Sequence, residues 1–176
     1  MLIILAGLPG AGKTTLAKGL AAQFGAVHLR IDTIEQAIRE SGVRMISLDD
    51  AGYRVAYALA EDNLRLGHIV IADSVNPWPL TRDAWVAVAT RAGVDWVEIE
   101  IVCSDEHEHR RRVETRVSDI PGLTLPTWAD VAARDYRAWD RPHTVIDTAN
   151  VSADESAAEV RAALGLVTST PSRRTP

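Results

Sequence analysis

One cysteine, Cys103, is present among the 176 residues, so no disulfide bond can form within the chain. A chain of this kind suits a reducing compartment. Long apolar runs are also missing, because no stretch approaches the roughly 20 apolar residues that a membrane-spanning helix needs. The apolar residues 1–6 end at Gly7, and no basic segment precedes them, which argues against a signal peptide. We therefore expect a soluble, cytoplasmic protein with no membrane partner.

Lysine is nearly absent, and this scarcity argues against one class of nucleotide-binding protein, the GTPases. Only Lys13 and Lys18 occur, and the other basic side chains are arginine or histidine. GTPases read guanine with an Asn-Lys-x-Asp motif, which needs a lysine after Lys18. The segment 119–122, Asp-Ile-Pro-Gly, imitates a GTPase switch motif but follows the wrong strand. The sequence therefore argues against a GTPase.

Charge and composition limit the binding partners that we expect and indicate a globular protein. The formal net charge is −5, which gives no general attraction for nucleic acid or anionic membranes. Hydrophobic residues make up 47% of the chain and charged residues 24%, a globular composition. The length suits one domain, which we place at residues 1–167. The remaining segment, 168–176, is rich in Ser, Thr, Pro and Arg, and we expect it to be a disordered tail.

Apolar runs alternate with helical patterns along the chain, which predicts an α/β fold with a parallel sheet covered on both faces. A segment at about 105–141 looks inserted between the last two strands, and we call it the lid. Ligands of such sheets bind at the carboxyl ends of the strands. The predicted strands are 2–6, 27–31, 68–72, 96–102 and 144–147. The predicted helices are 13–24, 32–40, 49 or 50 to 67, 80–92 and 106–116, followed by one that begins at 127 and one from 152 to about 165. In the helix that begins at 127, the helical spacing of apolar residues continues to Trp139. Capping boxes at Thr127/Asp130 and Ser152/Glu155 mark the starts of the last two helices.

The strongest motif is Gly-Leu-Pro-Gly-Ala-Gly-Lys-Thr at 7–14, which matches the phosphate-binding loop (P-loop, Walker A) at every fixed position. Glycines let backbone N–H groups turn inward around a phosphate, and the following helix adds its partial positive charge. Lys13 would contact the β- and γ-phosphates, and the Thr14 hydroxyl would bind Mg²⁺. A glycine-rich turn with a coincidental Lys-Thr is the alternative. The motif predicts ATP and Mg²⁺ as ligands, bound by Gly7, Leu8, Pro9, Gly10, Ala11, Gly12, Lys13, Thr14 and Thr15.

Asp32 follows the second predicted strand directly, at the sheet edge beside the P-loop. Phosphoryl transfer to a hydroxyl needs a carboxylate that orients the acceptor and takes its proton. Asp32 is therefore a candidate catalytic base and substrate-binding residue. The alternative is a purely structural role, because residues 32–35, Asp-Thr-Ile-Glu, also read as a capping box.

Asp73 follows the third predicted strand and should lie at the same edge. Acids at this place hold hydrated Mg²⁺, so Asp73 is a candidate metal and substrate residue together with Thr14. The alternative is that Asp73 caps the turn that leads to Asn76. Arg82, early in the next helix, either pairs with an acceptor phosphate or is simply solvated.

The helix at 106–116 carries four arginines, at 110, 111, 112 and 116. Consecutive residues of a helix point about 100° apart, whereas residues four apart share a face. Arg112 and Arg116, with His109 on the same face, are therefore the best pair to close onto the ATP phosphates. Arginine suits this role because its fork binds phosphate bidentately and stays charged. The alternative is a solvated helix whose arginines pair with Glu106, Glu108 and Glu114.

Other side chains receive no functional assignment from the pattern. Cys103 ends a buried strand and is expected in the core. His28, His68 and His143 flank strands and are expected to make ordinary hydrogen bonds. Arg30 is expected to be solvated.

The P-loop, Asp32, Asp73 and the segment 112–116 occur together in an order that resembles the small kinases of the AAA-type P-loop group. That group includes polynucleotide 5′-hydroxyl kinases, chloramphenicol phosphotransferase and zeta toxins. The resemblance covers residues 1–165 and implies the strand order 2-3-1-4-5, a lid that contains the arginine helix, Asp32 as the acceptor-activating base and Arg116 beside the nucleotide. The segment 73–76, Asp-Ser-Val-Asn, is similar to the segment after the third strand in polynucleotide kinases. Glu35 stands where those kinases commonly have a substrate-binding arginine, which argues against a polynucleotide acceptor.

Taken together, these patterns predict an ATP-dependent kinase that transfers the γ-phosphoryl group to a hydroxyl or phosphate acceptor. The acceptor would be a small molecule or a nucleotide-like compound, with a nucleic-acid 5′ end open but less favoured. The sequence does not identify the acceptor or the oligomeric state. The alternative is a nucleotide-dependent switch with little transferase activity.

Overall fold

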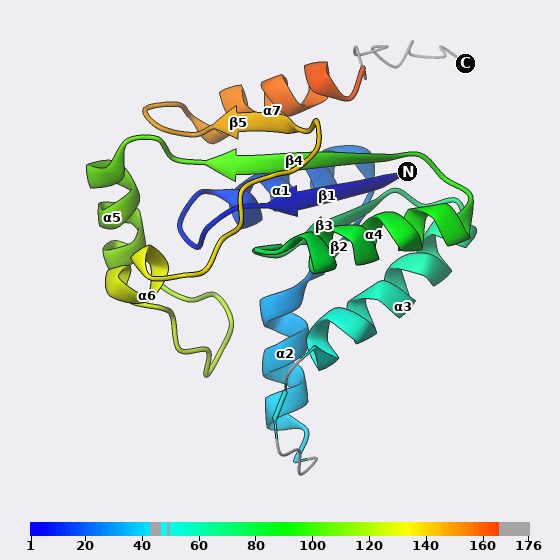
Figure 1. The fold of residues 1–176 in the computed structure, drawn as a ribbon, viewed down its shortest axis with the longest axis horizontal. Coiled ribbons are helices and arrows are strands. Elements are labelled where there is room, and N and C mark those ends of the chain that lie inside the picture. The colour runs from blue at the N-terminus through cyan, green and yellow to red at the C-terminus, as the bar shows by residue number, and fades with distance from the viewer. Residues whose placement is uncertain (43–46, 49, 166–176) are drawn as a thin grey trace, which may run out of the picture.

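The computed structural model describes residues 1–42, 47–48 and 50–165, which form a five-stranded parallel sheet with helices around it (Figure 1). The strand order is β2-β3-β1-β4-β5, and every neighbouring pair is parallel. The α/β fold class and the order 2-3-1-4-5 are therefore confirmed. The strands are β1 (Leu2–Ala6), β2 (Val27–Arg30), β3 (Val70–Asp73), β4 (Trp96–Val102) and β5 (Thr144–Asp147).

Two apolar cores lie on opposite faces of this sheet, because successive residues of a strand point to opposite sides. Leu2 and Ile4 of β1 pack with α3 and α4, while Ile3 and Leu5 pack with α1 and α7. The three layers of the αβα sandwich follow from this alternation. The helices are α1 (Lys13–Phe24), α2 (Ile31–Glu40), α3 (Ala51–Arg65), α4 (Pro79–Ala92), α5 (Glu106–Thr115), α6 (Trp128–Ala132) and α7 (Ala153–Ala163).

Three of the helices extend beyond the carboxyl ends of the strands, where the predicted ligands should bind. Figure 1 shows α5 and α6 at that end of β4, and α2 projecting from the end of β2. Both expected capping boxes are present, at Thr127/Asp130 before α6 and at Ser152/Glu155 before α7. None of the helices in the described ranges combines the length and apolar character that a bilayer crossing requires. The expected tail, 168–176, and Asp49 lie outside the described residues.

Two local predictions are wrong. The helix that begins at Trp128 ends at Ala132 and does not reach Trp139. Tertiary contacts take the place of the expected helix after Ala132. The backbone N–H of Arg137 donates to the Pro77 carbonyl at 2.8 Å, and the Trp139 ring stacks on His143 with centroids 4.1 Å apart. The capping box proposed at Asp32 is also absent.

The start of α2 explains why Asp32 does not act as a cap. The strand β2 passes directly into the helix at Ile31, so Arg30 occupies the cap position and Asp32 is the second helical residue. No side chain caps this end of α2. An exposed acid in the first turn of a helix still interacts favourably with the helix dipole.

Candidate functional site

The P-loop backbone is packed so closely that two of its glycines have no room for a side chain. Gly7 has φ +133°, and a Cβ there would lie 2.1 Å from the carbonyl oxygen of Ile101 in β4. Gly10 has φ +86°, and a Cβ would lie 2.5 Å from a methyl group of Val113 in α5. Only glycine allows this backbone conformation together with this close approach. The loop is thereby fixed between β1 and the amino end of α1.

Lys13 lies at the amino end of α1, and its side chain is directed back across the loop. Its Nζ donates a hydrogen bond to the Leu8 carbonyl at 2.9 Å. Burial lowers the pKa of Lys13 to about 8, although the charges of Asp73 and Asp32 act in the opposite direction. The first turn of α1 contains no acidic residue. A buried cation at an uncompensated helix N-terminus is a favourable site for phosphate.

Asp73 ends β3 and is almost completely buried, with 3% of its surface exposed. Burial alone would raise its pKa, but hydrogen bonds from His28 and Thr14 and the charge of Lys13 together hold the pKa below its usual value. The carboxylate is thus ionised and lies within hydrogen-bonding reach of the Thr14 hydroxyl. The predicted metal pair, Thr14 and Asp73, is brought together by the neighbouring strands β1 and β3.

These two oxygen donors suit Mg²⁺, which is commonly bound by one or two protein oxygens together with water and substrate phosphates. Among the residues that the structure describes, no three His, Cys, Asp or Glu side chains gather as a metal site of their own. A metal at Thr14 and Asp73 would therefore depend on phosphate oxygens for much of its coordination.

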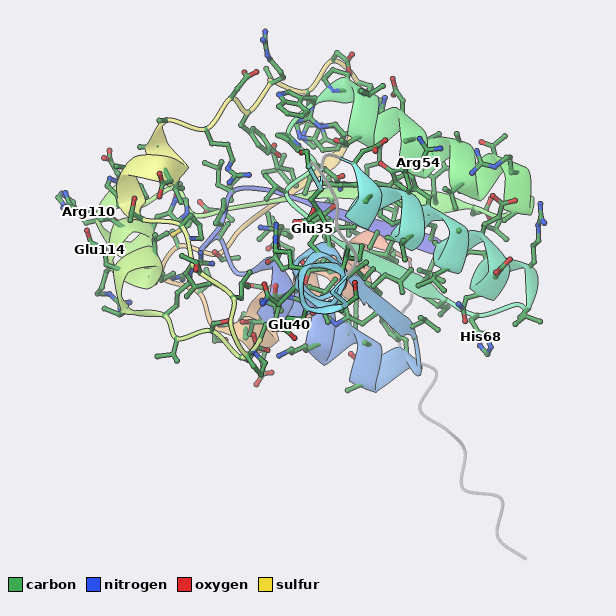
Figure 2. The ribbon with its side chains drawn as sticks, turned by 90° about the horizontal axis from the view of Figure 1, so that it is seen from below. Glu35, Glu40, Arg54, His68, Arg110 and Glu114 are labelled. Carbon is green, nitrogen blue, oxygen red and sulfur yellow. The ribbon has the colours of Figure 1, made fainter. Side chains whose placement is uncertain are left out.

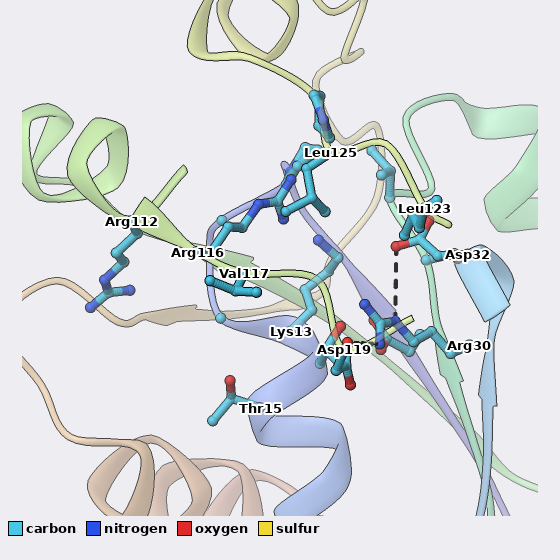
Figure 3. Close-up of a pocket in the computed structure, with 18 of the residues that line it drawn as sticks. Lys13, Thr15, Arg30, Asp32, Arg112, Arg116, Val117, Asp119, Leu123 and Leu125 are labelled. Carbon is cyan, nitrogen blue, oxygen red and sulfur yellow. Dashed lines mark hydrogen bonds and ion pairs between the residues drawn. The ribbon is translucent and has the colours of Figure 1, made fainter. Parts of the chain in front are cut away.

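A cavity of about 1340 Å³ opens over the P-loop and extends between α2 and the lid (Figure 3). This volume exceeds the roughly 300–1,000 Å³ of most small-molecule sites, so there is room for a nucleotide and a second ligand. Six of the nine predicted nucleotide-binding residues line it, whereas Gly7, Leu8 and Ala11 do not. Its lining includes Lys13, Thr14, Thr15, Asp73, Asp32, Arg116, Arg112 and the lid residues 115–117 and 122–126.

Asp32 and Arg116 face each other across this cavity from different parts of the chain. Figure 3 shows Arg116 extending from the end of α5 toward the space above Lys13, with Asp32 on the opposite side. The side chain of Asp32 is more than half exposed, and one of its carboxylate oxygens lies 3.9 Å from the Nε of Arg30. The Nε of Arg116 is buried and has no hydrogen-bond partner among the described residues. Burial lowers the pKa of Arg116, although its guanidinium remains protonated.

Arg112 lines the same cavity but has other partners. Its guanidinium donates to the Glu108 carboxylate at 2.7 Å and to the carbonyl and hydroxyl oxygens of Thr148 at 2.7 and 2.8 Å. Figure 3 shows it pointing away from Arg116. The two arginines therefore line the same cavity but point apart in this structure. On the outer side of α5, Arg110 pairs with Glu114 at 2.8 Å, as the alternative interpretation proposed (Figure 2).

Arg82 lies outside the cavity, which corrects its assignment as a substrate-binding residue. Its side chain is fully buried and donates to the carbonyls of Asn76, Pro77, Arg137 and Ala138. The guanidinium also lies 4.1 Å from the centroid of the Trp139 ring. Arg82 thus joins the segment after β3 to the segment after α6, and it offers no group to a ligand in the cavity.

Two residues of the site were missed by the motif search. Thr148 follows β5, and its hydroxyl donates to the Ala11 carbonyl of the P-loop at 2.9 Å. Its position directly after the last strand is the signal that could have identified it. Asp119 lies in the lid and pairs with Lys18 of α1 and with Arg30, the latter at 2.7 Å. Arg30 is accordingly paired rather than simply solvated.

Comparison with known proteins shows what this chain and its fold resemble. A family model described as an AAA domain matches residues 2–132. The fold is similar to the APS kinase CysC of Mycobacterium tuberculosis, solved with AMPPNP and APS (TM-score 0.67, 21% identity, 93% of this chain and 96% of that chain). It is also similar to Kti12 of Chaetomium thermophilum with ADP-AlF3 (TM-score 0.63, 23% identity, 93% and 98%) and to an unliganded sugar kinase from Janibacter (TM-score 0.68, 16% identity, 94% and 95%).

The identities to these solved structures are low, so the structures show a shared fold and nothing more. The family model covers most of the chain and therefore shows the family. The matched residues 2–132 include the P-loop and the strands β1 to β4. The chain therefore belongs to the AAA domain family, and it has the fold of the small P-loop kinases.

Proposed function

We propose that this protein is an ATP-dependent kinase that transfers the γ-phosphoryl group to a hydroxyl or phosphate group of a small or nucleotide-like acceptor. The observation that carries the proposal is the single cavity that joins the P-loop to Asp32 and Arg116 and has volume for two ligands. A protein that only binds a nucleotide needs no second compartment beside the phosphates. The consumption of ATP and the single cysteine both favour a cytoplasmic location.

Each side chain has a distinct task in this proposal. The P-loop backbone and Lys13 bind the β- and γ-phosphates. Thr14 and Asp73 would hold Mg²⁺, which supplies charge neutralisation at the phosphates when it is bound. Asp32 orients the acceptor hydroxyl and takes its proton. Arg116, which lines the cavity, stabilises the charge on the transferred group.

Arg112 receives a supporting role instead of a catalytic one. Its hydrogen bonds to Thr148, which in turn bonds to the P-loop, connect α5 to the loop. The lining of the cavity also includes Val151, Ala153 and Ser156, which follow Thr148 in the chain. We assign the nucleoside of ATP to that part of the lining and the acceptor to the space between α2 and residues 122–126.

The proposal is tested by replacing Asp32 with asparagine, which keeps the shape of the side chain and removes the base. In a screen of candidate acceptors, the wild-type protein should show acceptor-stimulated ADP production from ATP. Asp32→Asn should bind ATP with unchanged affinity and lose at least about 100-fold of the stimulated rate, in the range expected for a catalytic base. An unchanged stimulated rate would exclude Asp32 as the base.

One observation favours the alternative of a nucleotide-dependent switch. Asp119 of the lid pairs with Lys18 on α1, the helix that follows the P-loop, so nucleotide binding could shift the lid. A switch would show different hydrogen exchange at residues 116–126 with ADP and with a non-hydrolysable ATP analogue, and no acceptor would stimulate ADP production. A kinase shows stimulation by its acceptor.

A further inference from the structure

His28 of β2 lies directly behind the carboxylate that the site needs for its metal. Its Nε2 is 3.1 Å from Oδ2 of Asp73. In the parallel pairing of β2 with β3, His28 is opposite Ile71 and Arg30 is opposite Asp73, so the imidazole reaches two residues along the sheet toward Asp73. Both side chains are largely buried, with 17% of His28 and 3% of Asp73 exposed.

The chemistry of the pair determines the direction of this hydrogen bond. An ionised carboxylate can only accept, so the Nε2 of His28 carries the hydrogen and donates it. Asp73 also accepts from the Thr14 hydroxyl and lies near the Lys13 charge. The carboxylate is thereby held by Thr14 within the cavity and by His28 on β2.

His28 itself is positioned away from the ligands. It does not line the 1340 Å³ cavity, although Asp73 does. It lines a neighbouring, smaller cavity of about 430 Å³, whose lining shares Lys18, Arg30 and Asp119 with the larger one. His28 is absent from the lining of the larger cavity, and its hydrogen bond to Asp73 is the contact that connects it to bound phosphates or metal.

We propose that His28 is a positioning residue that fixes the orientation of the Asp73 carboxylate for the Mg²⁺ of a bound nucleotide. Partners of a metal-binding side chain set its rotation, and their loss typically lowers metal affinity by about 10–100-fold. Without His28, the Asp73 carboxylate can rotate and lose its alignment with Thr14. The inference rests on the proposed function, because it requires that the P-loop binds a magnesium nucleotide.

The test measures nucleotide binding instead of catalysis. A fluorescent ADP analogue is titrated into the wild-type protein and into His28→Ala, once with saturating Mg²⁺ and once with EDTA. We expect His28→Ala to bind about 10–100-fold more weakly in Mg²⁺ and with wild-type affinity in EDTA. His28→Gln, whose amide can also donate, should recover part of the affinity in Mg²⁺. His68→Ala changes an exposed histidine at the far end of the sheet from α5 and should match wild type (Figure 2).

The outcomes separate the two proposals. If wild type binds the analogue in neither condition, the proposed function fails. If wild type binds with a clear Mg²⁺ dependence and His28→Ala shows the same dependence, only the role of His28 is refuted. An equal loss in Mg²⁺ and in EDTA also refutes it, because that result indicates damage to the P-loop. Should His28→Ala not fold, His28→Gln is compared with wild type instead. Because the glutamine amide can still donate the hydrogen bond, a full loss of Mg²⁺ dependence in His28→Gln would refute the positioning role.

Discussion

Replacing Lys13 with methionine should abolish nucleotide binding and at the same time make the nucleotide-free protein more stable. The long methionine side chain fills much of the same space without the charge. Lys13 is buried and its charge is only partly compensated, because its pKa is lowered to about 8 even with Asp73 and Asp32 nearby. A binding residue of this kind lowers the stability of the protein that holds it.

The magnitude follows from the pKa. One pKa unit corresponds to about 1.4 kcal/mol, so a pKa of about 8 instead of 10.5 means that the charged form costs about 3 kcal/mol at pH 7. The variant also loses the hydrogen bond from Nζ to the Leu8 carbonyl, which is worth about 1 kcal/mol. The expected net gain is roughly 2 kcal/mol. For a domain of this length, that gain raises Tm by about 4–8 °C.

The assay is thermal unfolding of nucleotide-free protein in EDTA, at pH 7 and at pH 9.5. A lowered lysine pKa gives a cost that is complete below about pH 8 and disappears as the pH rises toward 10.5. The advantage of Lys13→Met should therefore shrink by about half or more at pH 9.5. Lys18→Met, which changes a half-exposed lysine of the same helix, is the control and should change Tm little at either pH.

Two results would refute this reasoning. A lower Tm for Lys13→Met at pH 7 would mean that the charge of Lys13 stabilises the fold. An advantage that is the same at both pH values would mean that the gain comes from packing and not from removal of a buried charge.

Two further predictions concern contacts away from the phosphates. Arg82→Met should destabilise the protein by about 3–5 kcal/mol in denaturant unfolding, because it removes the buried guanidinium and its hydrogen bonds to four backbone carbonyls. Asp119→Asn should change global stability by less than about 1 kcal/mol, since the Asp119 carboxylate is half exposed in its pairs with Lys18 and Arg30. It should nevertheless speed hydrogen exchange at residues 116–126, because those pairs attach this part of the lid to α1 and β2.

Arg82→Met has a control in the same chain. Arg54→Met removes an exposed arginine of α3 and should leave stability nearly unchanged, in contrast to Arg82→Met (Figure 2). A loss below about 1 kcal/mol for Arg82→Met would contradict the role that we give its buried hydrogen bonds. Unchanged exchange at 116–126 in Asp119→Asn would show that the lid is held by other contacts.

Much of this protein follows from short stretches of sequence. The P-loop at 7–14 is recognised locally, because a phosphate cradle needs glycines, a lysine and a hydroxyl at fixed spacing. The alternation of apolar runs and helices predicts a parallel sheet, and acids that directly follow strands are then expected at one edge. Asp32 and Asp73 were identified in this way, and both line the cavity.

Only the tertiary structure decided which side chains remain available to a ligand. Arg82, Arg112 and Arg116 are the same residue type, yet their surroundings differ. The first is buried among backbone carbonyls, the second is bound to Thr148, and the third has a buried nitrogen with no hydrogen-bond partner among the residues that the structure describes. His28 gained its importance from Asp73, 45 residues later in the chain. The periodicity of apolar residues indicates which face of its own helix or strand a residue occupies. The partner of a charged side chain depends instead on how distant segments pack, and no local pattern contains that information.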